Sequence, residues 1–238
     1  MPKWGALICS ASCLINGSAT QSMRWTERII AAHKRSLSER RPDRRGNLIT
    51  RWERWREGGG SEPCIEKALE LVADGNANEK ELGFYVMEDL ALNEPALRAH
   101  ISQLAHHRLA DVRRSLAFYL SREFPPKFQG AVYGTLLRDK AASVRVQTIT
   151  KIGMIYFKAL LPELRALRTH ELNGKVIDEL DYWIPLLEVG YRVQPSRTPG
   201  MLDVTALTGD GIASRSVATT DPNDPEILRA VEELRSHP

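Results

Sequence analysis

One stretch of the sequence decides the fold: LLRDKAASVR, residues 136–145. Leu136 and Leu137 end a segment whose apolar residues recur at helical spacing, and the polar residues after them break that segment. Val144 then opens a second segment with the same spacing. The stretch therefore predicts a short turn between two helices, and a related one, LADVRRSLA, covers residues 109–117.

The same pattern recurs along the chain with a nearly constant period. A leucine lies late in each of the expected first helices, at intervals of 33, 32 and 31 residues: Leu71, Leu104, Leu136 and Leu167. The expected second helices begin near Asn78, Asp111, Ser143 and Asn173. A period of this length is typical of repeat proteins, in which each helix pair needs its neighbours to bury its apolar face. The expected units are 63–92, 93–125, 126–157 and 158–190.

These stretches resemble HEAT repeats, which carry an Asp in the turn between their helices and a Val-Arg or Val-Lys pair at the start of the second helix. The third unit has both features, Asp139 and Val144-Arg145. The resemblance covers residues 63–190 and implies an all-α protein, an α-solenoid of about four HEAT-like helix pairs with N-terminal capping helices. In such stacks the second-helix arginines, here Arg113 and Arg145, bond turn acids and neighbouring repeats; contact with a ligand is the alternative.

The other units match the pattern less fully. The second unit has Val112-Arg113, but His107 occupies the position of the Asp. In the first and fourth units, Glu81 and Ile177 fall where the Arg is expected. The resemblance therefore predicts architecture and leaves chemistry open.

Composition changes outside the repeats predict the remaining domain boundaries. Residues 1–22 are expected to be a disordered leader, with a signal peptide as the alternative. Basic N-terminal helices are expected over 23–60, before a HEAT-like repeat domain over 61–190. Residues 191–223 are rich in Pro, Ser, Thr and Gly and are expected to be a linker, with no convincing strand. A short C-terminal helix is expected within 224–238.

Local signals predict where several helices begin and end. Asn78, with Glu81 three residues on, predicts a capping box. Pro185 is expected to kink or end the helix in which it lies, and Gly190 to close the last unit. Asp224-Pro225 predicts the start of the C-terminal helix.

Overall composition restricts the class of protein. Of the 238 residues, 42% are hydrophobic and 26% charged, an ordinary balance for a globular domain. The three cysteines, Cys9, Cys13 and Cys64, form neither a disulfide framework nor a zinc pattern. No apolar run approaches the roughly 18 residues that a membrane span needs. We therefore expect a cytoplasmic protein without a transmembrane segment, metal or cofactor.

The second unit contains the main candidate for partner binding. Arg114, Phe118 and Arg122 recur at i, i+4 and i+8 on its second helix, and Lys151 of the third unit is expected on the same face. In HEAT-like stacks the second helices line the concave surface. Arginine and aromatic side chains there suit an acidic, partly apolar partner. An ordinary solvated helix face is the alternative interpretation.

Asp178, Asp181 and Trp183 in the fourth unit form a second candidate partner-binding set. An acid beside an aromatic residue resembles the arrangement in HEAT-like alkylpurine DNA glycosylases, which hold a damaged base against aromatic faces. The alternative is a helix end with solvated acids and a packed Trp. His170-Glu171 is a single pair and cannot supply the ligands of a two-metal hydroxylase site.

The basic arm, residues 24–56, interleaves arginine with tryptophan and carries more positive charge than any other part of the chain. Such a segment can bind phosphate backbones or an anionic membrane surface. The same tryptophan spacing also fits one buried helix stripe with solvated arginines opposite.

No set of residues in the sequence indicates a particular reaction. The leading hypothesis is a scaffold or adaptor that binds a partner protein on the concave face of a HEAT-like solenoid. The alternative is a nucleic-acid-binding protein, of which a HEAT-like alkylpurine DNA glycosylase would be one kind.

Overall fold

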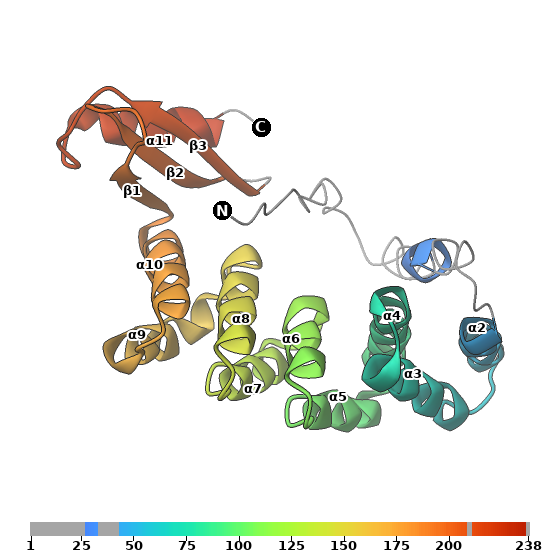
Figure 1. Cartoon of the computed structure of the whole chain (residues 1–238). Coiled ribbons are helices and arrows are strands. Elements are labelled where there is room, and N and C mark those ends of the chain that lie inside the picture. The colour runs from blue at the N-terminus through green and yellow to red at the C-terminus, as the bar shows by residue number, and fades with distance from the viewer. Residues whose placement is uncertain (1–26, 33–42, 209–210, 237–238) are drawn as a thin grey trace. The chain divides into compact units, whose positions relative to one another are not determined.

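The computed structural model of the chain describes residues 27–32, 43–208 and 211–236. This part is mostly helical, as predicted, and also contains a small antiparallel sheet (Figure 1). It divides into two compact units, an N-terminal unit up to Lys151 and a C-terminal unit from Ile152. The expected leader lies outside the described residues. Among the helices of the described chain, none combines the length and apolarity needed to cross a membrane.

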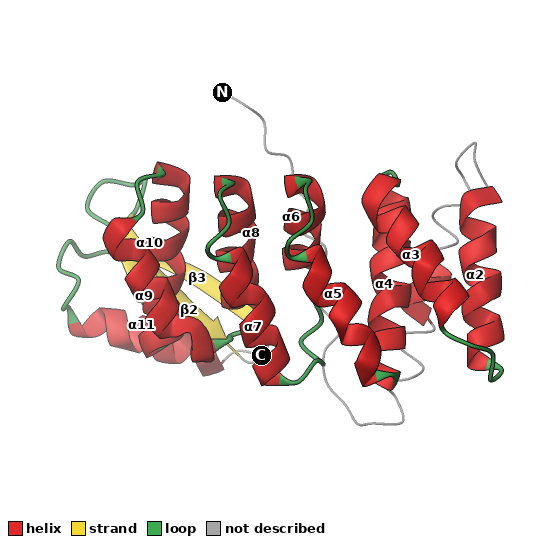
Figure 2. Ribbon diagram, turned by 90° about the horizontal axis from the view of Figure 1, so that it is seen from below, coloured by secondary structure: helices red, strands yellow, loops and turns green. Residues whose placement is uncertain are grey.

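The N-terminal unit is a series of helix pairs. Its elements are α2 (Asp43–Arg56), α3 (Glu62–Asp74), α4 (Ala77–Asn93), the 3-10 helix η1 (Pro95–Leu97), α5 (Arg98–Leu104), α6 (Ala110–Tyr119), α7 (Pro126–Leu136) and α8 (Ala142–Met154). Helices α3, α5 and α7 lie in one layer and α4, α6 and α8 in another, as Figures 1 and 2 show. Each second helix begins within one residue of its predicted start. This arrangement is compatible with a helical repeat.

Helix α4 begins with a capping box, but two residues earlier than predicted. Asn76 is the N-cap, and its Oδ1 accepts hydrogen bonds from the N–H groups of Asn78 and Glu79. The Glu79 carboxylate accepts one from the Asn76 N–H over 2.8 Å. The pair Asn76 and Glu79 has the same spacing as the predicted pair, Asn78 and Glu81. Spacing alone could not distinguish them, and the prediction of the later pair was wrong. Only the earlier pair satisfies the free N–H groups of the first turn.

The C-terminal unit contains the fourth helix pair and the sheet. Its elements are η2 (Lys158–Leu160), α9 (Leu161–His170), α10 (Gly174–Val189), β1 (Tyr191–Pro195), β2 (Leu202–Thr208), β3 (Gly211–Val217) and α11 (Pro225–Ser236). Helix α10 continues past Pro185, so that proline does not end it. Gly190 closes α10 as predicted, with a left-handed φ of 83°.

The linker predicted over 191–223 was wrong, because most of this segment forms an antiparallel sheet of order β1-β2-β3. One face of the sheet packs on α11, which begins at Pro225 as predicted. The cluster between them consists of Leu202, Val204, Ala206, Val217, Ile227, Ala230 and Val231. The strands contribute few apolar residues to it. Their composition therefore resembles that of a linker, although α11 completes a core.

Candidate functional site

Phe118 is the most prominent aromatic side chain on the described surface. It lies in the last turn of α6 and is 50% exposed. Its ring meets that of Tyr119 edge to face, with centroids 4.9 Å apart, and Tyr119 stacks on Phe84 of α4 at 5.0 Å. These contacts hold an exposed aromatic ring against its neighbours.

Lys151 of α8 lies beside Phe118. Its Nζ donates a hydrogen bond to the Phe118 carbonyl over 2.7 Å and lies 5.9 Å from the centre of the phenylalanine ring. The last carbonyl groups of a helix lack helical donors. Lys151 therefore caps the end of α6 from the next helix pair. We call Arg114, Phe118, Tyr119 and Lys151 the Phe118 surface.

The backbone that follows Phe118 is held by two further side chains. The buried Glu88 of α4 accepts a hydrogen bond from the Ser121 N–H at Oε1, over 2.8 Å. The Tyr133 hydroxyl donates to the Leu120 carbonyl over 3.3 Å. Side chains from α4, α7 and α8 thus fix the end of α6, and with it the position of Phe118.

Glu88 itself is in an unusual electrostatic environment. Burial raises its pKa to about 8, against the lowering effect of the Lys151 charge and of the Ser121 hydrogen bond. Its second oxygen, Oε2, has no hydrogen-bond partner among the described residues. Burial also lowers the pKa of Lys151, with Glu88 acting in the opposite direction. Sequence reasoning missed Glu88, because it lies in an ordinary run of helical residues.

The structure places the other residues of the predicted strip differently. Arg114 is exposed on α6, where its guanidinium donates to Asp111 over 2.6 Å. Asp111 also binds Lys80 of α4, and the hydrogen bond from Lys80 lowers its pKa. Arg122 lies beyond the end of α6 at Tyr119, so the predicted helical spacing of i, i+4 and i+8 is wrong for this residue. Phe118 and Lys151 are brought together.

Arg113 has the internal role that HEAT-like stacks predict. Its side chain is buried and binds the Asp139 carboxylate with two guanidinium nitrogens, one over 2.8 Å. Arg145 donates to the Asp139 carbonyl over 2.7 Å. Arg113 and Arg145 are the fourth residues of α6 and α8. The fourth residue of α4, in the first pair, is Lys80 rather than Glu81, and Lys80 binds Asp111 of the next pair.

The second predicted set, Asp178, Asp181 and Trp183, contains one buried residue and two exposed ones. Trp183 is buried, and its indole N–H donates to Glu179 over 3.0 Å. It packs so closely on Gly153 that a Cβ added there would lie 2.0 Å from the indole. Asp178 and Asp181 are exposed on α10. The packed-Trp interpretation therefore describes Trp183, which presents no open aromatic face.

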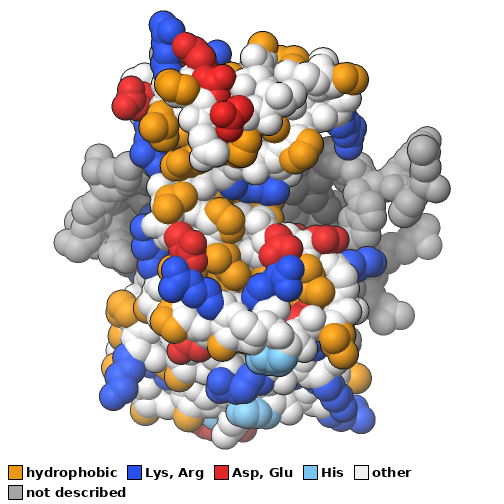
Figure 3. All heavy atoms as spheres, turned by 90° about the vertical axis from the view of Figure 1, so that its left-hand side faces the viewer, with side chains coloured by type: hydrophobic (Ala, Val, Ile, Leu, Met, Phe, Trp, Pro, Cys, Tyr) orange, Lys and Arg blue, Asp and Glu red, His pale blue; other side chains and the backbone are white. Residues whose placement is uncertain are grey.

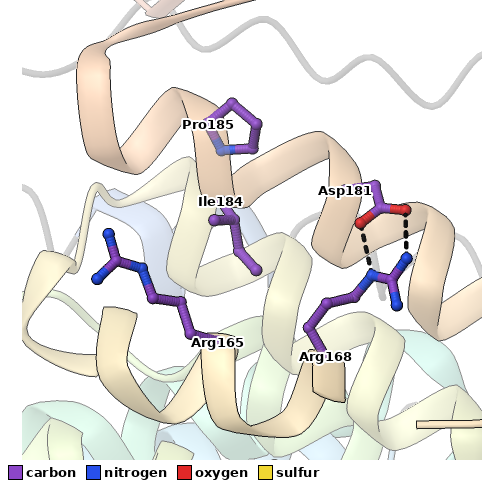
Figure 4. Close-up of a pocket in the computed structure, with 5 residues that line it drawn as sticks. All are labelled: Arg165, Arg168, Asp181, Ile184 and Pro185. Carbon is purple, nitrogen blue, oxygen red and sulfur yellow. Dashed lines mark hydrogen bonds and ion pairs between the residues drawn. The ribbon is translucent and has the colours of Figure 1, made fainter. Parts of the chain in front are cut away.

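Asp181 borders a shallow pocket of about 400 Å³ between α9 and α10. The other lining residues are Arg165, Arg168, Ile184 and Pro185, and Figure 4 shows the Arg168 guanidinium facing the Asp181 carboxylate. On the side of the molecule shown in Figure 3, basic and acidic side chains are interleaved with hydrophobic ones, and neither sign of charge gathers into a large patch.

Several side chains in the described part of the basic arm make internal contacts. Trp52 is 4% exposed and donates to Asp89 over 2.8 Å, and the indole of Trp55 donates to Glu94 over 2.5 Å. Arg51 donates to the Pro63 carbonyl over 2.6 Å. These contacts favour the buried-stripe interpretation of α2. Within the described residues, no group of three or more His, Cys, Asp or Glu side chains has a metal-binding arrangement.

No family model, curated protein or solved structure matches this chain. Its function must therefore be inferred from its own residues. The described part of the chain is mostly helical, and the Phe118 surface is a partly apolar patch on it.

Proposed function

We propose that this chain is a protein-binding scaffold or adaptor, in which HEAT-like helix pairs form an α-solenoid and present the Phe118 surface to a partner protein. The observation that carries the proposal is the half-exposed Phe118 ring, held by Tyr119 and Lys151. Aromatic and arginine side chains in fixed positions are the usual strong anchors of protein interfaces.

The HEAT-like part of the proposal is supported by bonds between successive helix pairs. Arg113 and Lys80 occupy the same position in their helices, and each binds an acid of the following pair, Asp139 and Asp111 respectively. The two acids stand at different places, Asp111 in the first turn of α6 and Asp139 in the turn before α8, and Arg145 at the same position of α8 bonds within its own pair. What the two pairs share is a basic residue that reaches the next pair, which is compatible with stacked repeats.

The chemistry of the Phe118 surface suggests what a partner would present. The phenylalanine ring suits an apolar side chain, and the exposed guanidinium of Arg114 suits a carboxylate next to it. The ion pair of Arg114 with Asp111 is about half exposed and therefore weak, so a partner carboxylate can share the guanidinium.

The nucleic-acid alternative has less support. Trp52 is buried, and Trp55 and Arg51 are hydrogen-bonded within the protein. In the C-terminal unit, burial of Trp183 removes the open aromatic face on which a flipped base would stack.

The test is to identify a stoichiometric partner by affinity purification with the full chain and to measure its binding by calorimetry. Phe118→Ala combined with Arg114→Glu should weaken binding at least about tenfold, roughly 1–2 kcal/mol, with helicity unchanged. The matched control, Leu228→Ala with Arg229→Glu on the exposed side of α11, should bind like wild type. Equal affinity of the Phe118 variant and wild type would refute the proposed surface.

A further inference from the structure

The last helix pair differs from the earlier pairs at a position that those pairs bury. The eighth residue of the second helix is Phe84 in α4, Ala117 in α6 and Ile149 in α8, and all three are fully buried. In α10 the same position holds Asp181, whose side chain is 54% exposed.

The first helices show a matching change. The residue after the repeated leucine is Val72 in α3, Ala105 just after α5 and Leu137 just after α7, and each is buried. In α9 the equivalent residue is Arg168, whose side chain is 42% exposed. One position in each helix is thus apolar in three pairs and charged in the fourth.

The two charged residues bind each other. The Nε and Nη2 atoms of Arg168 donate to the two Asp181 carboxylate oxygens over 2.6 and 3.1 Å, the paired contact that Figure 4 shows. A second ion pair, from Arg165 to Glu188 over 2.6 Å, also joins α9 to α10. The two charged residues therefore form one ion pair between α9 and α10.

In the N-terminal unit, the same helix position contacts the next pair, since Phe84 stacks on Tyr119 of α6. The corresponding side of α9 and α10 is where a further helix pair would pack. After Gly190 the chain instead forms β1 to β3 and α11, which pack on one another.

We infer that α9 and α10 are built to end the series of helix pairs, and that the Arg168–Asp181 ion pair prevents a second copy of this chain from packing there as a further pair. In water the exposed ion pair has little effect on stability. If a second copy packed over it, both charges would lose their hydration, which is costly unless each finds a new partner. A polar outer face of this kind is what keeps the terminal unit of a repeat series soluble.

The test restores the residue types of the earlier pairs in the full chain. Arg168→Leu with Asp181→Ile copies the third pair, and Arg168→Ala with Asp181→Ala copies the second. Sedimentation equilibrium should show that both variants self-associate at least about tenfold more tightly than wild type, by the removal of the desolvation cost. The alanine variant should fold in any case, because alanine is favourable in helices.

Two controls separate this effect from a general gain of apolar surface. Glu226→Ile with Arg229→Leu removes a comparably exposed ion pair from α11 and should leave self-association unchanged. Arg168→Asp with Asp181→Arg keeps an ion pair and should behave like wild type. The inference is overturned if neither apolar variant self-associates, or if the α11 control associates as strongly as they do. It is also overturned if wild type already self-associates and the Arg168/Asp181 apolar variants do not.

Discussion

The Nζ of Lys151 donates a hydrogen bond to the Phe118 carbonyl, so a side chain of α8 caps the end of α6. The same end is held by Glu88 through the Ser121 N–H. Phe118 is therefore exposed on a backbone that the neighbouring helices fix. Lys151 therefore positions Phe118. The sequence also predicts that Lys151 contacts a partner.

Replacing Lys151 by Met should lower the free energy of unfolding by about 1–3 kcal/mol, since the Phe118 carbonyl loses its donor. Urea unfolding followed by circular dichroism measures the change. Lys127→Met, at an exposed position of α7, is the matched control. A loss for Lys151→Met as small as that of the control would contradict the prediction.

The buried carboxyl of Glu88 should make stability depend on pH. The folded pKa, about 8, lies above the unfolded value of 4.5, so the folded state binds this proton more tightly. Its contribution to stability is therefore fully present below pH 4.5 and is lost as pH rises through about 8. Lys151 contributes with opposite sign, between its lowered pKa and its ordinary value of 10.5.

Glu88→Gln should remove the downward slope of the unfolding free energy between about pH 5 and 8, a slope that one proton limits to about 1.4 kcal/mol per pH unit. Urea unfolding at several pH values, compared with wild type, measures it. Glu66→Gln, at an exposed position on α3, is the control and should retain the wild-type slope. Identical pH profiles for Glu88→Gln and wild type would show that Glu88 is not the titrating group.

Gly153 should not tolerate a side chain, because a Cβ there would overlap the Trp183 indole. Gly153→Ala should cost about 1–3 kcal/mol in urea unfolding, the usual range for overpacking a core. Gly174 at the start of α10 is the matched glycine, since a Cβ there meets nothing within 4 Å. Gly174→Ala should be neutral or stabilise by up to about 1 kcal/mol. Equal effects of the two substitutions would rule out the packing contact.

Two adjacent arginines of α6 should differ in their contribution to stability. Arg113 and Asp139 form an ion pair in which each side chain is 6% exposed, whereas Arg114 pairs with Asp111 at about half exposure. Arg113→Met should cost about 3 kcal/mol, because it leaves Asp139 buried without its main partner. Arg114→Met should cost about 1 kcal/mol or less. Urea unfolding of both variants checks the order, and a reversal would disprove the structural role of Arg113.

The sequence by itself determined the helix pairs. The recurring leucines, including Leu104 and Leu136, and the Val-Arg starts at Val112 and Val144 predicted the second helices to within one residue. Gly190 correctly predicted the end of α10, and Asp224-Pro225 correctly predicted the start of α11. Such signals act within a few residues, because apolar periodicity and helix capping depend on neighbours in the chain.

Only the tertiary structure decided the rest, since it depends on partners distant in sequence. Ala206 becomes a core residue because α11 supplies Ile227 and Val231 across the sheet. Glu88 resembles any helical glutamate until Ser121, 33 residues away, donates to it in a buried site. The sequence predicts Asp181 as a binding residue, whereas the structure pairs it with Arg168, 13 residues before it. Strand pairing, burial and ion-pair partners are set by packing between elements, which local sequence patterns do not encode.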